Sequence, residues 1–119
     1  MAIAPRPETL LPLPTATFHI LMSVADGERH GYAIIQDIEA RTNGALRLSA
    51  GTLYRSIQRM LDQRLLAEVH ERPAPEDDDE RRRYYRITSR GRRAAAEEIR
   101  TLATLVRQAR ATGLVVKPS

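Results

Sequence analysis

A group of hydrogen-bonding side chains at helical spacing is the feature of this sequence best suited to recognition chemistry. Ser49 has the residue type of a helix N-cap, and the pattern after it predicts a helix that runs to about Gln63. The apolar stripe of this helix is formed by Leu53, Ile57, Met60 and Leu61. Roughly opposite the stripe lie Thr52, Arg55, Arg59 and Gln63. These polar types can read the edges of base pairs, so the outer face is a candidate nucleic-acid surface. The alternative is an ordinary solvated helix face.

A second concentration of positive charge begins at Arg81–Arg83. From Arg81 to Arg93 there are seven arginines and no acidic residue, a pattern typical of a surface that binds phosphate. The acidic block Glu76–Glu80 comes directly before it and would repel phosphate. We expect this block to form a loop tip that points away from the nucleic acid or pairs with nearby arginines. A solvated charge run is the alternative interpretation of the arginines.

The composition narrows the class of protein. The chain has 119 residues and a formal net charge of +4, and Lys117 is its only lysine among 19 basic residues. Arginine favours planar, bidentate contacts to phosphate and guanine. The absence of cysteine excludes disulfides, thiol nucleophiles and cysteine-based metal sites. The three histidines, His19, His30 and His70, show no paired spacing, and no catalytic set is recognisable. We therefore expect neither an enzyme nor a metal or cofactor site.

The sequence also indicates where the protein works. It contains no apolar run of about 18 residues, the length that a membrane-spanning helix needs. Prolines interrupt the N-terminal segment, which does not resemble a secretory signal. The expected location is the cytoplasm, with no membrane partner.

The first half of the chain is predicted to contain an arm and two helices. Residues 1–14 hold four of the seven prolines and are expected to form a flexible, extended arm. Thr15 is a candidate N-cap for a helix of about eleven residues that ends at Asp26-Gly27. Its apolar pattern consists of Phe18, Leu21, Met22 and Ala25. A second helix is expected from about His30 to the stop at Asn43-Gly44, with its stripe formed by Ala33, Ile34 and Ile38.

The remaining elements are short strands and a long C-terminal helix. Leu46–Leu48 alternates and predicts a very short strand. Leu66–Val69 and Tyr85–Ile87 predict the two strands of a hairpin. Thr88 or Ser89 is expected to cap a last helix that runs to about Ala111 and stops at Gly113. Its heptad-like seam is formed by Ala95, Ile99, Leu102, Val106 and Ala109. The core is too small to offer these apolar side chains an obvious place. The seam therefore predicts that the helix pairs with a second copy of the chain in a homodimer.

Together these elements predict a mainly α fold with a small antiparallel β-hairpin, namely a winged helix-turn-helix with a C-terminal dimerisation helix. The predicted division is a flexible arm at 1–14, a DNA-binding domain at 15–88, the dimerisation helix at 89–112 and a flexible tail at 113–119. In this arrangement the third helix enters the major groove and the hairpin reaches the backbone or the minor groove.

Three ordered motifs make the chain resemble the PadR family of bacterial transcriptional regulators. The motifs are His30-Gly31-Tyr32, then Gly51-Thr52-Leu53-Tyr54-Arg55-Ser56-Ile57, then Arg83-Tyr84-Tyr85-Arg86-Ile87-Thr88 with Gly91. The family often has proline where this chain has Arg55, and proline or glutamate where it has Ala50. The resemblance implies a winged helix-turn-helix dimer that is in most cases a repressor. Some members of the family dissociate from DNA when a small molecule binds to them. The short C-terminal part resembles the compact subgroup with one terminal helix.

The candidate sites follow from these patterns and from the resemblance. The DNA-binding candidates are Tyr32, Ser49, Thr52, Tyr54, Arg55, Arg59, Arg81, Arg82 and Arg83. The dimerisation candidates are Ile99, Leu102, Val106 and Ala109, and Phe18 and Met22 are candidates for lining an effector pocket between the first and last helices. The expected partners are a palindromic double-stranded operator, a second copy of the chain and a small-molecule effector. One alternative is a winged-helix adaptor that binds protein without reading DNA sequence, which the acidic block favours. A small basic RNA-binding protein is another, but aromatic residues make up only 4% of the chain.

Overall fold

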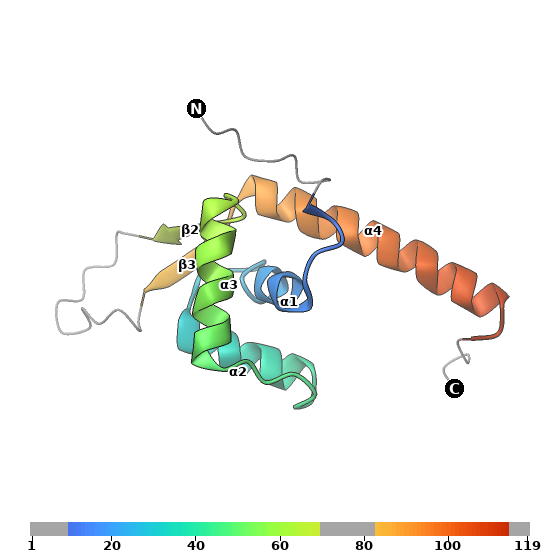
Figure 1. Ribbon diagram of the computed structural model, residues 1–119, viewed down its shortest axis with the longest axis horizontal. Coiled ribbons are helices and arrows are strands. Elements are labelled where there is room, and N and C mark those ends of the chain that lie inside the picture. Colours follow the sequence, from blue (N-terminus) through green and yellow to red (C-terminus); the bar gives the residue numbers. More distant parts are fainter. Residues whose placement is uncertain (1–9, 70–82, 115–119) are drawn as a thin grey trace.

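Four helices and a small sheet make up the fold of the protein (Figure 1). The computed structural model describes residues 10–69 and 83–114. The elements in chain order are α1 (Thr15–Ser23), β1 (Arg29–His30), α2 (Gly31–Arg41), α3 (Ala50–Asp62), β2 (Leu66–Val69), β3 (Tyr84–Ile87) and α4 (Ser89–Ala111). Helix α1 ends before the predicted Asp26-Gly27 stop. Asn43 and Gly44, which follow α2, both adopt the left-handed backbone conformation that ends a helix, as the sequence predicts.

The sheet has three antiparallel strands in the order β1-β3-β2. Leu66 pairs with Ile87 across the hairpin, and His30 pairs with Tyr84 on the other side of β3. The prediction of a strand at Leu46–Leu48 is wrong, because Arg29–His30 supplies the third strand. Leu46 and Leu48 alternate for another reason: both turn towards the core, and the backbone N–H of Leu46 donates to Thr42 Oγ1 at 3.0 Å within the loop.

Side-chain caps fix where three of the helices begin. The hydroxyl of Ser49 accepts the Thr52 N–H at 3.1 Å at the start of α3, and Thr88 Oγ1 accepts the Gly91 N–H at 2.9 Å at the start of α4. His30 Nδ1 accepts the Ala33 N–H at 3.1 Å and caps α2. The predicted Thr15 cap is wrong: Pro14 occupies the N-cap of α1, makes no side-chain hydrogen bond and leaves Thr15 as the first helical residue.

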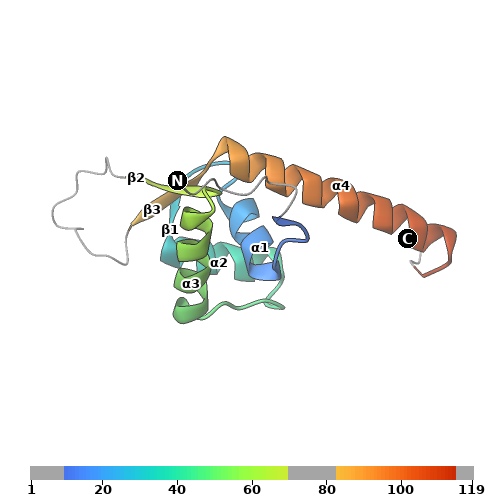
Figure 2. The ribbon, with the colours of Figure 1, turned by 45° about the horizontal axis from the view of Figure 1, so that its top comes forward.

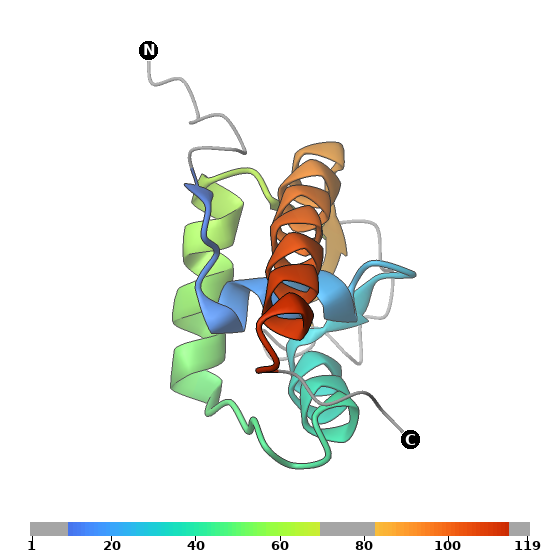
Figure 3. The same ribbon diagram turned by 90° about the vertical axis from the view of Figure 1, so that its right-hand side faces the viewer.

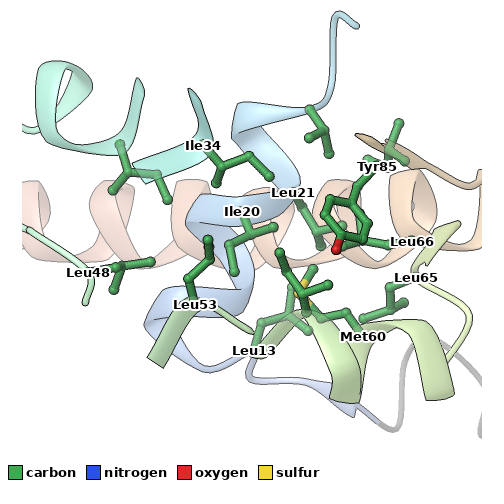
Figure 4. Packing of buried hydrophobic residues seen from close by; sticks show 14 of the residues in the cluster. Leu13, Ile20, Leu21, Ile34, Leu48, Leu53, Met60, Leu65, Leu66 and Tyr85 are labelled. Atoms are coloured by element: carbon green, nitrogen blue, oxygen red, sulfur yellow. The ribbon is translucent and has the colours of Figure 1, made fainter. Parts of the chain in front are cut away.

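One hydrophobic cluster joins all four helices and the sheet (Figure 4). Its most enclosed side chains include Ile20, Leu21, Ile34, Ile38, Leu53, Ile57, Met60 and Leu65. The predicted inner faces of α2 and α3 are confirmed. Helix α1 is rotated relative to the prediction, since Thr17, Ile20, Leu21 and Val24 form its buried face. Phe18, Met22 and Ala25 are half-buried instead, because α2, α3 and α4 pack against the Ile20 side of the helix.

The segment before α1 contacts the last helix. Leu13 is buried in the core, and its backbone N–H donates to Glu98 Oε1 of α4 at 2.6 Å. Glu98 is only 8% exposed although it carries a carboxylate. The sequence assigns residues 10–14 to a flexible arm, but these residues pack on the domain; residues 1–9 lie outside the described part. The reason is that Leu13 fills the core while its N–H supplies the donor that a buried carboxylate needs.

The contact between Leu13 and Glu98 leads to a stability prediction. Replacing Glu98 with alanine leaves the buried Leu13 N–H without its acceptor and should lower the free energy of unfolding by about 1.5–3 kcal/mol. Urea unfolding at one fixed protomer concentration measures this loss. The matched control is Glu97→Ala, whose carboxylate lies on the outer face and pairs with Arg100. If Glu97→Ala lowers the stability as much as Glu98→Ala does, the buried hydrogen bond contributes nothing particular.

Helix α4 is longer than the domain that it packs against. Its first half covers α1, and its second half projects beyond the other elements in two different views (Figures 1 and 2). Figure 3 looks along this projecting half towards the domain. Within the described ranges 10–69 and 83–114, no helix is long and apolar enough to cross a membrane.

Candidate DNA interface

The outer face of α3 carries a connected set of hydrogen-bonding groups. Ser49 Oγ and Thr52 Oγ1 are 3.1 Å apart, and Arg55 Nη2 lies 3.5 Å from the same Thr52 hydroxyl. Arg59 lies one turn after Arg55 and is exposed, as Arg55 is. Leu53, Ile57 and Met60 anchor the opposite side of the helix in the core. The face therefore presents two guanidinium groups and two hydroxyls on a rigid support, with donors that fit phosphate oxygens and guanine edges.

The start of α2 packs directly against α3 through Gly31 and Tyr54. A Cβ atom on Gly31 would lie 2.4 Å from Tyr54 Oη, so only glycine lets the tyrosine ring approach the backbone of α2 this closely. Tyr32, the next residue, is 61% exposed. The structure thus explains the His30-Gly31-Tyr32 motif: the histidine caps the helix, the glycine receives Tyr54, and Tyr32 remains available at the surface. Tyr54 is largely a packing residue.

An ion-pair cluster holds β1 against α2. Arg29 donates to the Ser23 carbonyl at 2.6 Å and lies 3.8 Å from Asp37, which also accepts from Arg41 at 2.7 Å. Burial raises the pKa of the Asp37 carboxyl, but the Arg41 hydrogen bond and the charges of Arg41 and Arg29 lower this pKa more, so the net shift is downward. The carboxylate is therefore ionised at neutral pH and fixes the strand β1, which contains the capping His30.

The predicted wing arginines fall mostly outside the described part of the chain. Arg81 and Arg82 lie there, as does the acidic block Glu76–Glu80. Arg83, at the start of β3, is exposed and lies 3.7 Å from Glu68 of β2. The two strands of the hairpin that would carry the wing are present, and of Arg81–Arg83 the described part of the chain includes Arg83.

The projecting half of α4 exposes an apolar stripe. Ile99, Leu102 and Val106 are 48%, 41% and 43% exposed, and Ala109 is half-exposed on the same side. Leu105, which the sequence pattern does not select, is 53% exposed at the edge of the stripe. Leu105 lies seven residues after Glu98, so the line of Gly91 and Glu98, which face the core in the first half of α4, continues along the Leu105 edge of the stripe. The same face is thus covered by the domain at one end and uncovered at the other.

The candidate effector-pocket residues lie on α1. Phe18 and Met22 are half-buried at the side of the core. In the described part of the chain, no three histidine or acidic side chains lie close enough together to hold a metal ion.

Comparison with known proteins identifies the family to which the chain belongs. The transcriptional regulator PadR-like family matches residues 20–97, which is more than half of the chain. The chain belongs to this family. It is therefore a DNA-binding transcriptional regulator and not an enzyme, and the predicted winged helix-turn-helix fold is confirmed. No curated protein is significantly similar to it in sequence.

Solved structures of regulators share the fold. A PadR family transcription regulator from hypervirulent Clostridium difficile is 18% identical, with a TM-score of 0.68 over 83% of this chain and 98% of its own. A transcriptional regulator from Clostridium thermocellum is 21% identical, with a TM-score of 0.66 over 81% of this chain and 87% of its own. RosR of H. salinarum is 21% identical, with a TM-score of 0.64 over 88% and 92%. Each of these structures shares the fold over more than four fifths of this chain.

Arg47 lies just before α3, but the sequence pattern does not indicate it as a DNA-binding candidate. It lies two residues before the α3 cap, is exposed, and pairs with Glu39 of α2. The alternation of Leu46 and Leu48 predicts a strand that would contain Arg47, and this prediction is wrong. The sequence signal for Arg47 is a basic residue between two inward-facing leucines, directly before the Ser49 cap of α3.

Proposed function

We propose that this PadR-like regulator is a homodimeric repressor that reads a palindromic operator with α3. The role is supported most strongly by the exposed Arg55 and Arg59 beside the half-buried Thr52, on a helix whose other side is fixed in the core. Ser49 and Arg83, together with Arg81 and Arg82 outside the described residues, would hold the backbone. Repression is supported by the resemblance to PadR regulators, and the site of action would be the cytoplasm.

The dimer rests on the stripe of α4. Fully burying a large exposed apolar side chain contributes about 1.5–3 kcal/mol. The large side chains of the stripe are 41–48% exposed in the single chain, so a second copy that covers them adds part of this free energy for each. Two copies related by a twofold axis would place their α3 helices about one helical turn of DNA apart, which suits a palindrome. Release by a small molecule bound beside Phe18 and Met22 stays a prediction; a thermal shift that disappears in Met22→Arg would support it.

Separating the roles of helix and wing tests the proposed function. The operator is first selected from random-sequence duplexes with purified protein. Arg59→Ala should then weaken binding to that operator by about 1–3 kcal/mol and change binding to random duplex little, because Arg59 is assigned to base edges. Arg82→Ala should weaken both duplexes alike and flatten the slope of log affinity against log salt by about one.

The matched control for both variants is Arg107→Ala. Arg107 is an exposed arginine of α4 away from α3, so its removal changes the net charge without touching the proposed site. If Arg59→Ala weakens operator and random duplex equally, α3 does not read sequence and the assignment is wrong. Absence of any preferred sequence would favour the adaptor alternative.

A further inference from the structure

The ion pair between Arg47 and Glu39 joins α2 to the segment just before α3. Arg47 Nη2 and Nε lie 2.5 and 2.8 Å from the same oxygen, Glu39 Oε2. The Arg47 side chain is 75% exposed, whereas the Glu39 side chain is 34% exposed. The guanidinium group is therefore held by one carboxylate oxygen while most of its surface remains open to solvent.

The backbone that carries Arg47 is rigidly placed. Thr42 Oγ1 donates to the Ile38 carbonyl at 2.9 Å and accepts the Leu46 N–H at 3.0 Å, which fixes the chain before Arg47. Leu48 is buried directly after it, and Ser49 then caps α3. Arg47 thus has a fixed position beside the first turn of α3, the turn that carries Thr52.

We propose that Arg47 is a phosphate-contacting residue of the DNA interface and that Glu39 restrains it by occupying its guanidinium group in the free protein. This inference rests on the proposed function of α3. A solvent-exposed ion pair contributes little to stability, so a duplex phosphate, which offers two oxygens in the geometry that arginine prefers, can replace the carboxylate. Glu39 competes with the phosphate for this guanidinium group. It thereby weakens binding to DNA of any sequence. The base contacts of α3 then contribute a larger share of the affinity for the operator.

A double-mutant cycle on a fluorescein-labelled random-sequence duplex tests this restraint. Arg47→Ala should weaken binding and flatten the salt slope by about one, because one phosphate contact is lost. Glu39→Gln should tighten binding by about two- to fivefold, because it releases Arg47 from an exposed ion pair. Combined with Arg47→Ala, Glu39→Gln should change binding no more than the control does.

The control is Glu97→Gln, which removes the same charge from an exposed pair on α4. Equal effects of Glu39→Gln with and without Arg47 would overturn the proposal, because the gain would then come from net charge alone. An unchanged affinity and salt slope in Arg47→Ala would overturn it too. Arg59→Ala separates this failure from failure of the proposed function. If Arg59→Ala still weakens binding to the selected operator more than binding to random duplex, α3 reads DNA sequence and only the role of Arg47 is wrong.

Discussion

Replacing Leu102 and Val106 together with glutamate is expected to convert the protein from a dimer to a monomer. Both side chains lie on the uncovered stripe of α4, where they are 41% and 43% exposed in the single chain. Opposed copies would bring the new carboxylates together in an apolar interface, where an unpaired charge is costly. Because a monomer binds only one half-site, operator affinity should fall by about 10²–10⁴-fold, the gain that linking two binding events provides. Sedimentation equilibrium and fluorescence anisotropy measure the two effects.

The same two charges on the other side of α4 provide the control. Thr104→Glu with Gln108→Glu places them at helical positions opposite the stripe, so the dimer and most of the operator affinity should remain. A wild-type protein that sediments as a monomer at micromolar concentration would contradict the proposed dimer. So would a stripe variant that remains a dimer.

Gly91→Ala is expected to destabilise the protein strongly although it adds a single methyl group. A Cβ atom at this position would lie 2.3 Å from the Leu65 carbonyl oxygen, 3.0 Å from Ile87 Cγ1 and 3.2 Å from Leu21 Cδ2. The first of these contacts is with backbone, which cannot rotate away. The same carbonyl accepts the Thr88 N–H at 3.2 Å, so moving α4 outward would also strain the cap of that helix.

The size of this effect is a balance of two terms. Alanine favours the helix by about 1 kcal/mol relative to glycine. Overpacking a core costs about 1–3 kcal/mol and more where backbone must move, so we expect a net loss of about 2 kcal/mol in the free energy of unfolding. Gly27→Ala is the matched control, because nothing lies within 4 Å of its added Cβ atom. Thermal or urea unfolding of the two variants should differ clearly. Equal stability would show that α4 can shift without cost.

The position of α4 also concerns function. Gly91 lets the helix begin close to the junction of α3 and β2, and the direction of α4 from that point places the stripe relative to α3. A variant that folds with a displaced α4 should therefore bind the selected operator less well even at concentrations where it is dimeric, because the two α3 helices would no longer match the half-site spacing.

The sequence alone determined the elements whose signals are local. The bounds of α3, its Ser49 cap and its division into an apolar and a polar face follow from residues within four positions of one another. The stripe of α4 is equally local, since Ile99, Leu102 and Val106 repeat at heptad spacing. The PadR-like family was also recognisable, because its motifs are short and ordered along the chain.

Only the tertiary structure decided the contacts between residues far apart in sequence. The strand at Arg29–His30 forms because β3 offers a free edge beside it, and two residues carry no strand signal of their own. Leu13 and Glu98 are 85 residues apart, and neither residue type indicates the buried hydrogen bond that joins them. The same holds for Gly31 beneath Tyr54, and for Glu39 against Arg47 across the turn between α2 and α3. A periodic pattern shows which face of a helix is apolar, but the partner of a particular side chain depends on how the helices and strands pack together.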